Sequence, residues 1–149
     1  MKHIYLSLEQ AKEIHEKTIE VSGGGTLGVL DGGRLDSVLQ HIQNDDYYPI
    51  FLDKITHLFF ATNKFHTFQD GNKRIAITLS AQFLLLNGYM YCSSRFIREM
   101  ENISYHLAAG RIDRDLLRRV IESVINETID TDEELKLDIF HAIKDDSHE

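Results

Sequence analysis

Apolar residues recur at intervals of three and four along most of the chain, which is the period of a helix that buries one face. A short example predicts a helix near Arg34 to His41, with four apolar residues sharing one face: Leu35, Val38, Leu39 and Ile42. Only residues 89–92 and the approach to Pro49 read as extended. The pattern therefore predicts an all-α domain of six to seven helices, with at most a small β-hairpin flap.

Capping signals set the expected helix boundaries. Ser7-Leu8-Glu9-Gln10 is a capping box, so the first helix should start at Ser7 and end before Ser22. Helices are also expected over 51–63, over a stretch ending at Gly110, and after Asp113 as N-cap. A further helix should run from Asn72 to Asn87-Gly88, and its apolar residues cover most of its circumference. That helix is expected to be the buried centre of the fold.

The chain divides by charge near residue 127. The whole sequence of 149 residues has a net charge of −8, and the last 22 residues hold eight Asp or Glu against Lys136 and Lys144. Thr131-Asp132-Glu133-Glu134 resembles another capping box and is followed by apolar residues at helical spacing. We therefore expect one domain over 1–127 and an acidic C-terminal helical extension over 128–149.

Composition argues against several classes of protein. The net negative charge disfavours direct nucleic-acid binding, which needs a basic face. Cys92 is the only cysteine, which rules out an internal disulfide and suits the cytoplasm. The N-terminus lacks the apolar run of a signal peptide, and the apolar stretch Ile75 to Leu86 is too short to cross a membrane. A cytoplasmic protein without a membrane anchor is expected.

Two glycine-containing segments have features of a phosphate-binding site, but the first lacks the neighbouring elements that such a site needs. Gly23-Gly24-Gly25-Thr26-Leu27-Gly28 matches the spacing of a dinucleotide-binding loop. A helix rather than a strand precedes it, and the turn-forming residues Asp31-Gly32-Gly33 follow it, so the required context is absent. We interpret this segment as a connecting loop.

The second segment, His66 to Arg74, carries more chemistry than packing requires. It places an imidazole, a carboxylate, a glycine, an amide and two cations just before and within the first turn of the predicted central helix. Free N–H groups and the positive end of the dipole make a helix start suitable for an anion such as phosphate.

Each residue of this segment has a possible role in that site. Gly71 would let the backbone approach the anion, while Asn72, Lys73 and Arg74 supply donors and positive charge. Asp70 has the chemistry to hold Mg²⁺ against phosphate oxygens, and His66 can take the proton from an attacking hydroxyl. The expected catalytic residues are His66, Asp70 and Arg74.

The same nine residues resemble the signature of the Fic/Doc superfamily. Seven of the nine positions fit His-x-Phe-x-Asp-Gly-Asn-Lys-Arg, and the ending Gly-Asn-Lys-Arg is similar to the Doc, or death-on-curing, branch. The segments 35–39, 87–89 and 108–114 also look like the Doc pattern. The resemblance implies a helical Fic fold with His66 as general base, Asp70 as Mg²⁺ ligand, and Gly71, Asn72 and Arg74 around nucleotide phosphates.

The resemblance leaves three functions open. Lys73 makes the motif similar to that of Doc-type kinases, which pass the γ-phosphate of ATP to a threonine of elongation factor Tu and so arrest translation. Such toxins are inhibited by an antitoxin, with which they form a type II toxin–antitoxin pair. Most Fic proteins have glycine there and transfer AMP, so a protein AMP transferase is the first alternative. The second is a module that binds a nucleotide or partner without catalysis.

Overall fold

The computed structural model describes residues 2–21, 32–64 and 72–146. Within these residues the chain forms seven α-helices, and the all-α expectation is confirmed. The helices are α1 (Leu8–Val21), α2 (Gly32–His41), α3 (Phe51–Asn63), α4 (Asn72–Leu86), α5 (Met90–Ala108), α6 (Arg114–Ile125) and α7 (Glu133–Asp146).

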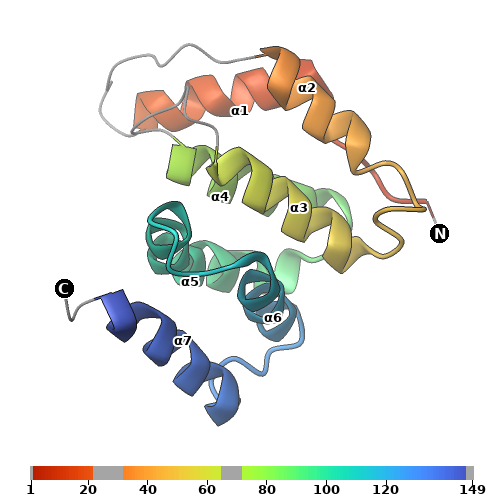
Figure 1. Cartoon of the computed structure of the whole chain (residues 1–149). Coiled ribbons are helices and arrows are strands. Elements are labelled where there is room, and N and C mark those ends of the chain that lie inside the picture. The colour runs from red at the N-terminus through yellow and green to blue at the C-terminus, as the bar shows by residue number, and fades with distance from the viewer. Residues whose placement is uncertain (1, 22–31, 65–71, 147–149) are drawn as a thin grey trace.

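The helices stack in pairs around α3 and α4, as Figure 1 shows. Helices α1 and α2 cover one side of this central pair, and α5 and α6 cover the other. Helix α7 lies outermost, against α6. The pair that flanks the 66–74 segment is therefore held from both sides.

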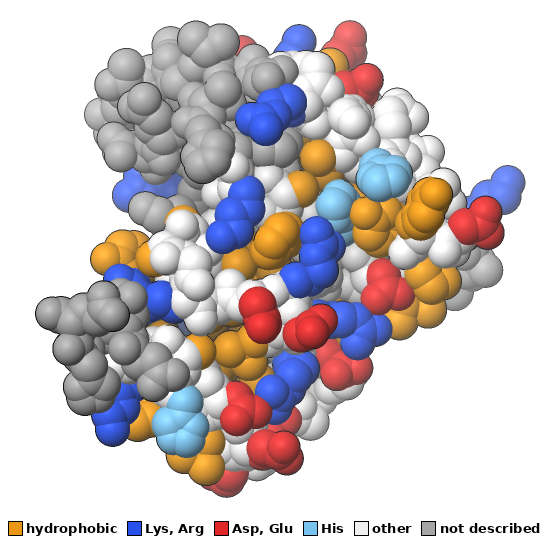
Figure 2. Space-filling model, viewed as in Figure 1, with side chains coloured by type: hydrophobic (Ala, Val, Ile, Leu, Met, Phe, Trp, Pro, Cys, Tyr) orange, Lys and Arg blue, Asp and Glu red, His pale blue; other side chains and the backbone are white. Residues whose placement is uncertain are grey.

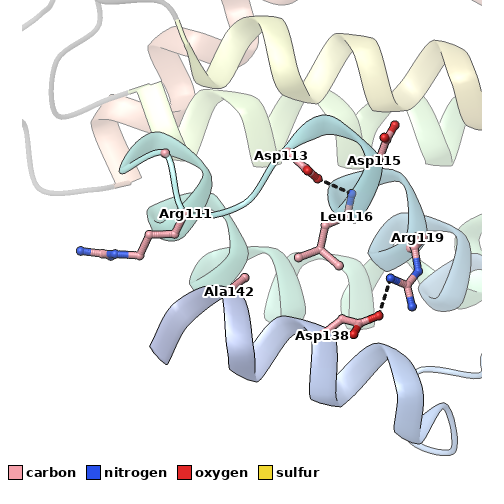
Figure 3. Close-up of a pocket in the computed structure, with 8 residues that line it drawn as sticks. Arg111, Asp113, Asp115, Leu116, Arg119, Asp138 and Ala142 are labelled. Carbon is pink, nitrogen blue, oxygen red and sulfur yellow. Dashed lines mark hydrogen bonds and ion pairs between the residues drawn. The ribbon is translucent and has the colours of Figure 1, made fainter. Parts of the chain in front are cut away.

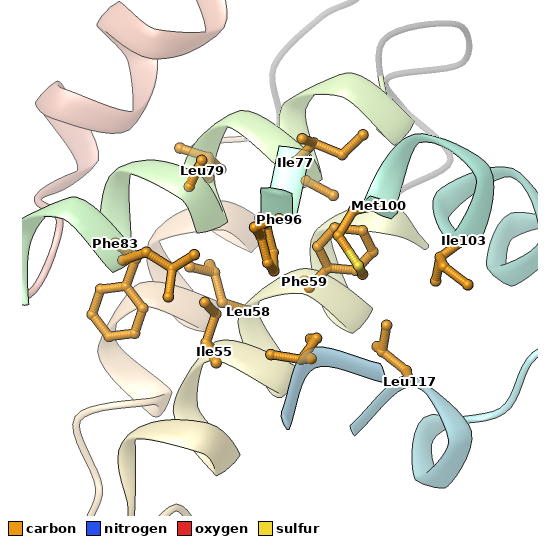
Figure 4. Packing of buried hydrophobic residues seen from close by; sticks show 14 of the residues in the cluster. Ile55, Leu58, Phe59, Ile77, Leu79, Phe83, Phe96, Met100, Ile103 and Leu117 are labelled. Atoms are coloured by element: carbon orange, nitrogen blue, oxygen red, sulfur yellow. The ribbon is translucent and has the colours of Figure 1, made fainter. Parts of the chain in front are cut away.

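Helix α4 has the central position that its apolar composition predicts. Its buried side chains point in several directions, because α1, α3 and α5 all pack against it. The core around it combines residues of α3, α4, α5 and α6 (Figure 4), including Leu58, Phe59, Leu79, Phe83, Phe96, Met100 and Leu117. Burial at this density fixes the direction and the start of α4.

Most of the predicted helix ends are confirmed by hydrogen bonds. The Ser7 amide donates to Gln10 Oε1 at 2.9 Å and the Gln10 amide donates to Ser7 Oγ at 3.1 Å, which is the reciprocal pattern of a capping box. Asp113 caps α6 by accepting from the Leu116 amide at 2.8 Å. Gly88 has a φ of 89° and closes α4, a conformation that glycine adopts without strain.

Two local predictions were wrong. Residues 90–92 are the first turn of α5 rather than an extended segment. As helix, this stretch places Cys92 four residues before Phe96, so both side chains fall on the buried face. Gly32 and Gly33 begin α2 instead of forming a turn.

The acidic tail forms the expected helix, but its cap is one residue later than predicted. Asp132 Oδ1 accepts from the Leu135 amide at 3.0 Å, whereas the Thr131 hydroxyl donates back to the Thr128 carbonyl. Ile129 and Leu135 are buried, and Asp138 pairs with Arg119 of α6 at 2.7 Å. The division of the chain at residue 127 stays a prediction.

The sequence predicted at most a small β-hairpin flap, a connecting loop over residues 23–28 and no membrane-spanning helix. The described residues contain no strand, and the segment 23–28 lies outside them. A helix long and apolar enough to cross a membrane is not found among the residues that the structure describes.

Candidate functional site

The predicted site falls at the junction of the two central helices. Helix α3 ends at Asn63 and α4 begins at Asn72. Of the predicted site residues, His66, Asp70 and Gly71 lie outside the described residues. Asn72 and Lys73 are the first two residues of α4, although their side chains are not described.

Arg74, the last predicted site residue, lies in the first turn of α4 with an exposed side chain. Ile75 and Ala76, which follow it, are 1% and 0% exposed. Arg74 is therefore held at the surface by buried neighbours. Its carbonyl oxygen accepts a hydrogen bond from the Thr78 hydroxyl, one turn later in α4, at 3.0 Å.

The start of α4 is electrostatically positive. No acidic residue occurs in its first turn, and Lys73 and Arg74 add two cations to the positive end of the helix dipole. The first N–H groups of a helix have no partner within the helix. Such a helix end is favourable for a phosphate group in general, and phosphate binding at α4 stays a prediction.

A second group of cations gathers where α3 ends. Lys64 Nζ lies 5.5 Å from the centroid of the Phe60 ring, and the Arg114 guanidinium carbon lies 4.3 Å from the same centroid. Both distances fit cation–π contacts. Figure 2 shows Lys and Arg side chains along the middle of this face of the molecule, among acidic ones.

His57 belongs to this face and is hydrogen-bonded rather than free. Its Nδ1 lies 3.1 Å from Arg114 Nη1, and since arginine can only donate, Nδ1 is the acceptor. The ring stacks on Tyr48 with centroids 4.7 Å apart. Desolvation, followed by the charges of Arg114 and His41, lowers the pKa of His57 to about 4. No local sequence pattern connects His57 to Arg114, its partner 57 residues away.

A hollow lies away from the start of α4. A space of about 420 Å³ opens between the start of α6 and α7, lined by side chains of both signs that include Asp113, Asp115, Arg119 and Asp138. In Figure 3, Asp113 points to the Leu116 amide, Arg119 points to Asp138, and Arg111 points away. Asp113 already caps α6 and Arg119 already pairs with Asp138, so we do not place the site there.

No metal site can be assembled from the described side chains. Across residues 2–21, 32–64 and 72–146, His, Cys, Asp and Glu form no group of three that could hold an ion. The predicted Mg²⁺ ligand, Asp70, is not among these residues, so its role stays a prediction.

Comparison with known proteins gives one consistent answer. Residues 5–84 match the model of the Fic/DOC family. A protein of Escherichia phage P1 called "Protein kinase doc" is 31% identical over 134 residues, which is 83% of this chain and 98% of that protein. "Toxin Doc" of Mycolicibacterium smegmatis is 30% identical over 99 residues, 64% of this chain and 76% of the toxin. No solved structure matches the chain significantly.

Proposed function

The chain belongs to the Fic/DOC family, and on that basis we propose that it is a Doc-like toxin that transfers the γ-phosphate of ATP to a Thr or Ser hydroxyl of another protein. The observation that carries this proposal is the motif from His66 to Arg74 at the start of the central helix. Similarity to a protein kinase along 98% of that relative's length supports it.

The reaction assigns one task to each group. The acceptor hydroxyl attacks the γ-phosphorus, its proton passes to His66, and the bond from the γ-phosphorus to the β,γ-bridging oxygen breaks to release ADP. The start of α4 and Arg74 bind the phosphate oxygens. Asp70 would hold Mg²⁺, which neutralises charge on the phosphates when it is bound.

Lys73 favours phosphate transfer over AMP transfer. The resemblance places glycine at this position in enzymes that transfer AMP, and lysine in the Doc-type kinases. By this resemblance, a lysine at position 73 would crowd the space that otherwise takes the α-phosphate, and it adds a positive charge. We therefore favour the kinase reaction.

The biological setting of the proposal follows from the Doc relatives. One relative is called a toxin, which supports an antitoxin partner for this chain within a type II toxin–antitoxin system. We propose elongation factor Tu as the target, arrest of translation as the result, and the cytoplasm as the place of action.

The experiment that tests the reaction uses ATP labelled at either the α or the γ phosphate. Purified chain is incubated with Mg²⁺, labelled ATP and elongation factor Tu, and labelled protein is detected after electrophoresis. Transfer from γ-labelled ATP alone is expected. Transfer from α-labelled ATP would replace the kinase with an AMP transferase, and transfer of neither label would favour a module without catalysis.

A further inference from the structure

The C-terminal end of α3 is tied to α5 by a buried amide. Asn63 is 2% exposed, and its Nδ2 donates to the Ser104 carbonyl oxygen at 3.1 Å and to Ser104 Oγ at 2.9 Å. A backbone carbonyl only accepts, so the nitrogen of the amide must face Ser104. Ser104 is itself 0% exposed. Both partners are buried, and a hydrogen bond between buried groups is costly to lose.

The next residue makes a second tie to the same helix. Lys64 Nζ donates to the Leu107 carbonyl oxygen at 2.6 Å, one residue before α5 ends at Ala108. The Leu107 carbonyl also accepts from the Gly110 amide at 3.1 Å. Carbonyls at the end of a helix carry partial negative charge, so an ammonium group is favourable there. Asn63, the last residue of α3, and Lys64, its C-cap, thus fix the end of this helix against the last turns of α5.

These ties lie immediately before the proposed catalytic base. His66 follows Asn63 by three residues and Lys64 by two. Three residues of chain span at most about 11 Å, so a shift at Asn63 has little chain over which to dissipate. A misplacement of about 1 Å in a catalytic group can lower a rate about 100-fold.

An apolar residue would fill the position of Asn63 without the cost of burying an amide. Its carbonyl oxygen Oδ1 is buried and has no hydrogen-bond partner among the described residues. A buried acceptor in that condition reduces stability. The amide therefore supplies direction, through two hydrogen bonds to a residue 41 positions away, more than it supplies stability.

We propose that Asn63, held by Ser104, is a positioning residue that sets the location of His66 relative to α4. The inference rests on the proposed function, because it assigns His66 as the general base. Lys64 assists from the next position through its bond to Leu107. Neither residue needs to touch ATP for this role.

The test compares Asn63 with a neighbour of equal burial. Asn63→Asp keeps the size of the side chain but removes the donor, and Asn63→Ala removes the whole amide. Thr62→Val is the matched control: Thr62 is 0% exposed, and its hydroxyl bonds to the Leu58 carbonyl at 2.6 Å, within α3 itself. The control loses a buried hydrogen bond but keeps the tie to α5.

Steady-state transfer from γ-labelled ATP gives kcat and the KM for ATP, and thermal unfolding of each protein gives Tm. We expect kcat to fall about 10- to 100-fold in both Asn63 variants, with KM changed less than about twofold. Thr62→Val should lower Tm and leave kcat within about twofold. Ser104→Ala, which removes one of two acceptors, should give a smaller loss of kcat and serves as the test if the Asn63 variants do not fold.

Two outcomes would overturn different parts of the account. If the wild type transfers phosphate and the Asn63 and Ser104 variants keep its kcat, the positioning role is wrong and the proposed function stands. If the wild type transfers no label, the proposed function is wrong, and the inference falls with it.

Discussion

The starts of α4 and α6 differ although both helices pack on α3. Helix α6 has its own carboxylates: Asp113 accepts from the Leu116 amide at 2.8 Å, and Asp115 lies in the first turn. Helix α4 has no acidic residue in its first turn, and Lys73 and Arg74 lie there instead. Among the described residues, carboxylates balance the dipole at the start of α6, whereas the first turn of α4 carries only positive charges.

This difference distinguishes a helix start that the chain's own carboxylates stabilise from one that we propose binds a phosphate. A carboxylate at a helix start stabilises the fold by satisfying N–H groups and the dipole. Cations at the same place add to the dipole and reduce stability unless an anion binds. The first turn of α4 holds no carboxylate of its own, and we propose that a bound phosphate supplies negative charge there.

The largest expected effect comes from His66, the proposed general base. His66→Ala should lower phosphate transfer at least 100-fold, because general-base catalysis contributes about 10² to 10⁴ in rate. Labelled-ATP assays measure the loss. The control is His141→Ala, which removes an exposed histidine on α7. Equal activity in the two variants would remove His66 from the reaction.

A smaller effect is expected from the exposed arginine of α4. Arg74→Ala should raise the KM for ATP about tenfold or more, since a hydrogen bond to a charged group contributes about 1.5–3 kcal/mol. Arg98→Ala, an exposed arginine on α5, should leave KM unchanged. A KM that is the same in Arg74→Ala and wild type would mean that phosphate does not contact this turn.

Removing the compensation of α6 should affect folding and spare activity. Asp113→Ala loses the N-cap bond and should lower stability by about 1 kcal/mol, which corresponds to about 2–4 °C in Tm. Asp113→Ser keeps a capping oxygen and should recover most of that loss. Thermal unfolding checks both variants. A lower kcat per folded molecule in Asp113→Ala would show that the start of α6 takes part in the reaction, which would contradict its purely structural role.

A further prediction concerns pH and His57, which accepts a hydrogen bond from Arg114, the first residue of α6. The pKa of His57 is lowered to about 4 by burial, whereas the unfolded chain has the ordinary value near 6.5. Between these values the unfolded state binds the proton first, so stability is full above about pH 6.5 and falls toward pH 4. The Tm of wild type should decline through this window, and His57→Gln should decline less.

Some decline will remain in His57→Gln, because burial also lowers the pKa of His15. Identical slopes of Tm against pH in wild type and His57→Gln would show that His57 does not titrate in this way.

The sequence predicted the helices well because their signals are local. Ser7, Asp113 and Gly88 act within four residues of their own positions, so capping patterns identify them. The segment 89–92 was misread because its two tyrosines, Tyr89 and Tyr91, favour strands by composition. Burial of Cys92 beside Phe96 outweighed that preference.

The same limit applies at the tail. Thr131 and Asp132 are both good caps, and sequence alone could not choose between them. In the structure Asp132 is the cap, and the helix that starts there buries Leu135, which is 1% exposed.

For the site, the motif gave the residues but not their surroundings. The chain from 66 to 74 is contiguous, so its chemistry could be read directly from the sequence. The ties of Asn63 to Ser104 and of His57 to Arg114 join positions 41 and 57 residues apart. Such pairs depend on how α3 packs on α5 and α6, and no local pattern encodes that.

The most direct test of the central claim is an amide NMR titration of the chain with Mg²⁺ and ATP. If phosphate docks at the start of α4, the backbone amide signals of Asn72, Lys73 and Arg74 will shift in a saturable way, and those of Asp115 and Leu116 at the start of α6 will not. Shifts at α6 with none at α4, or no saturable shift at either helix, would contradict the account.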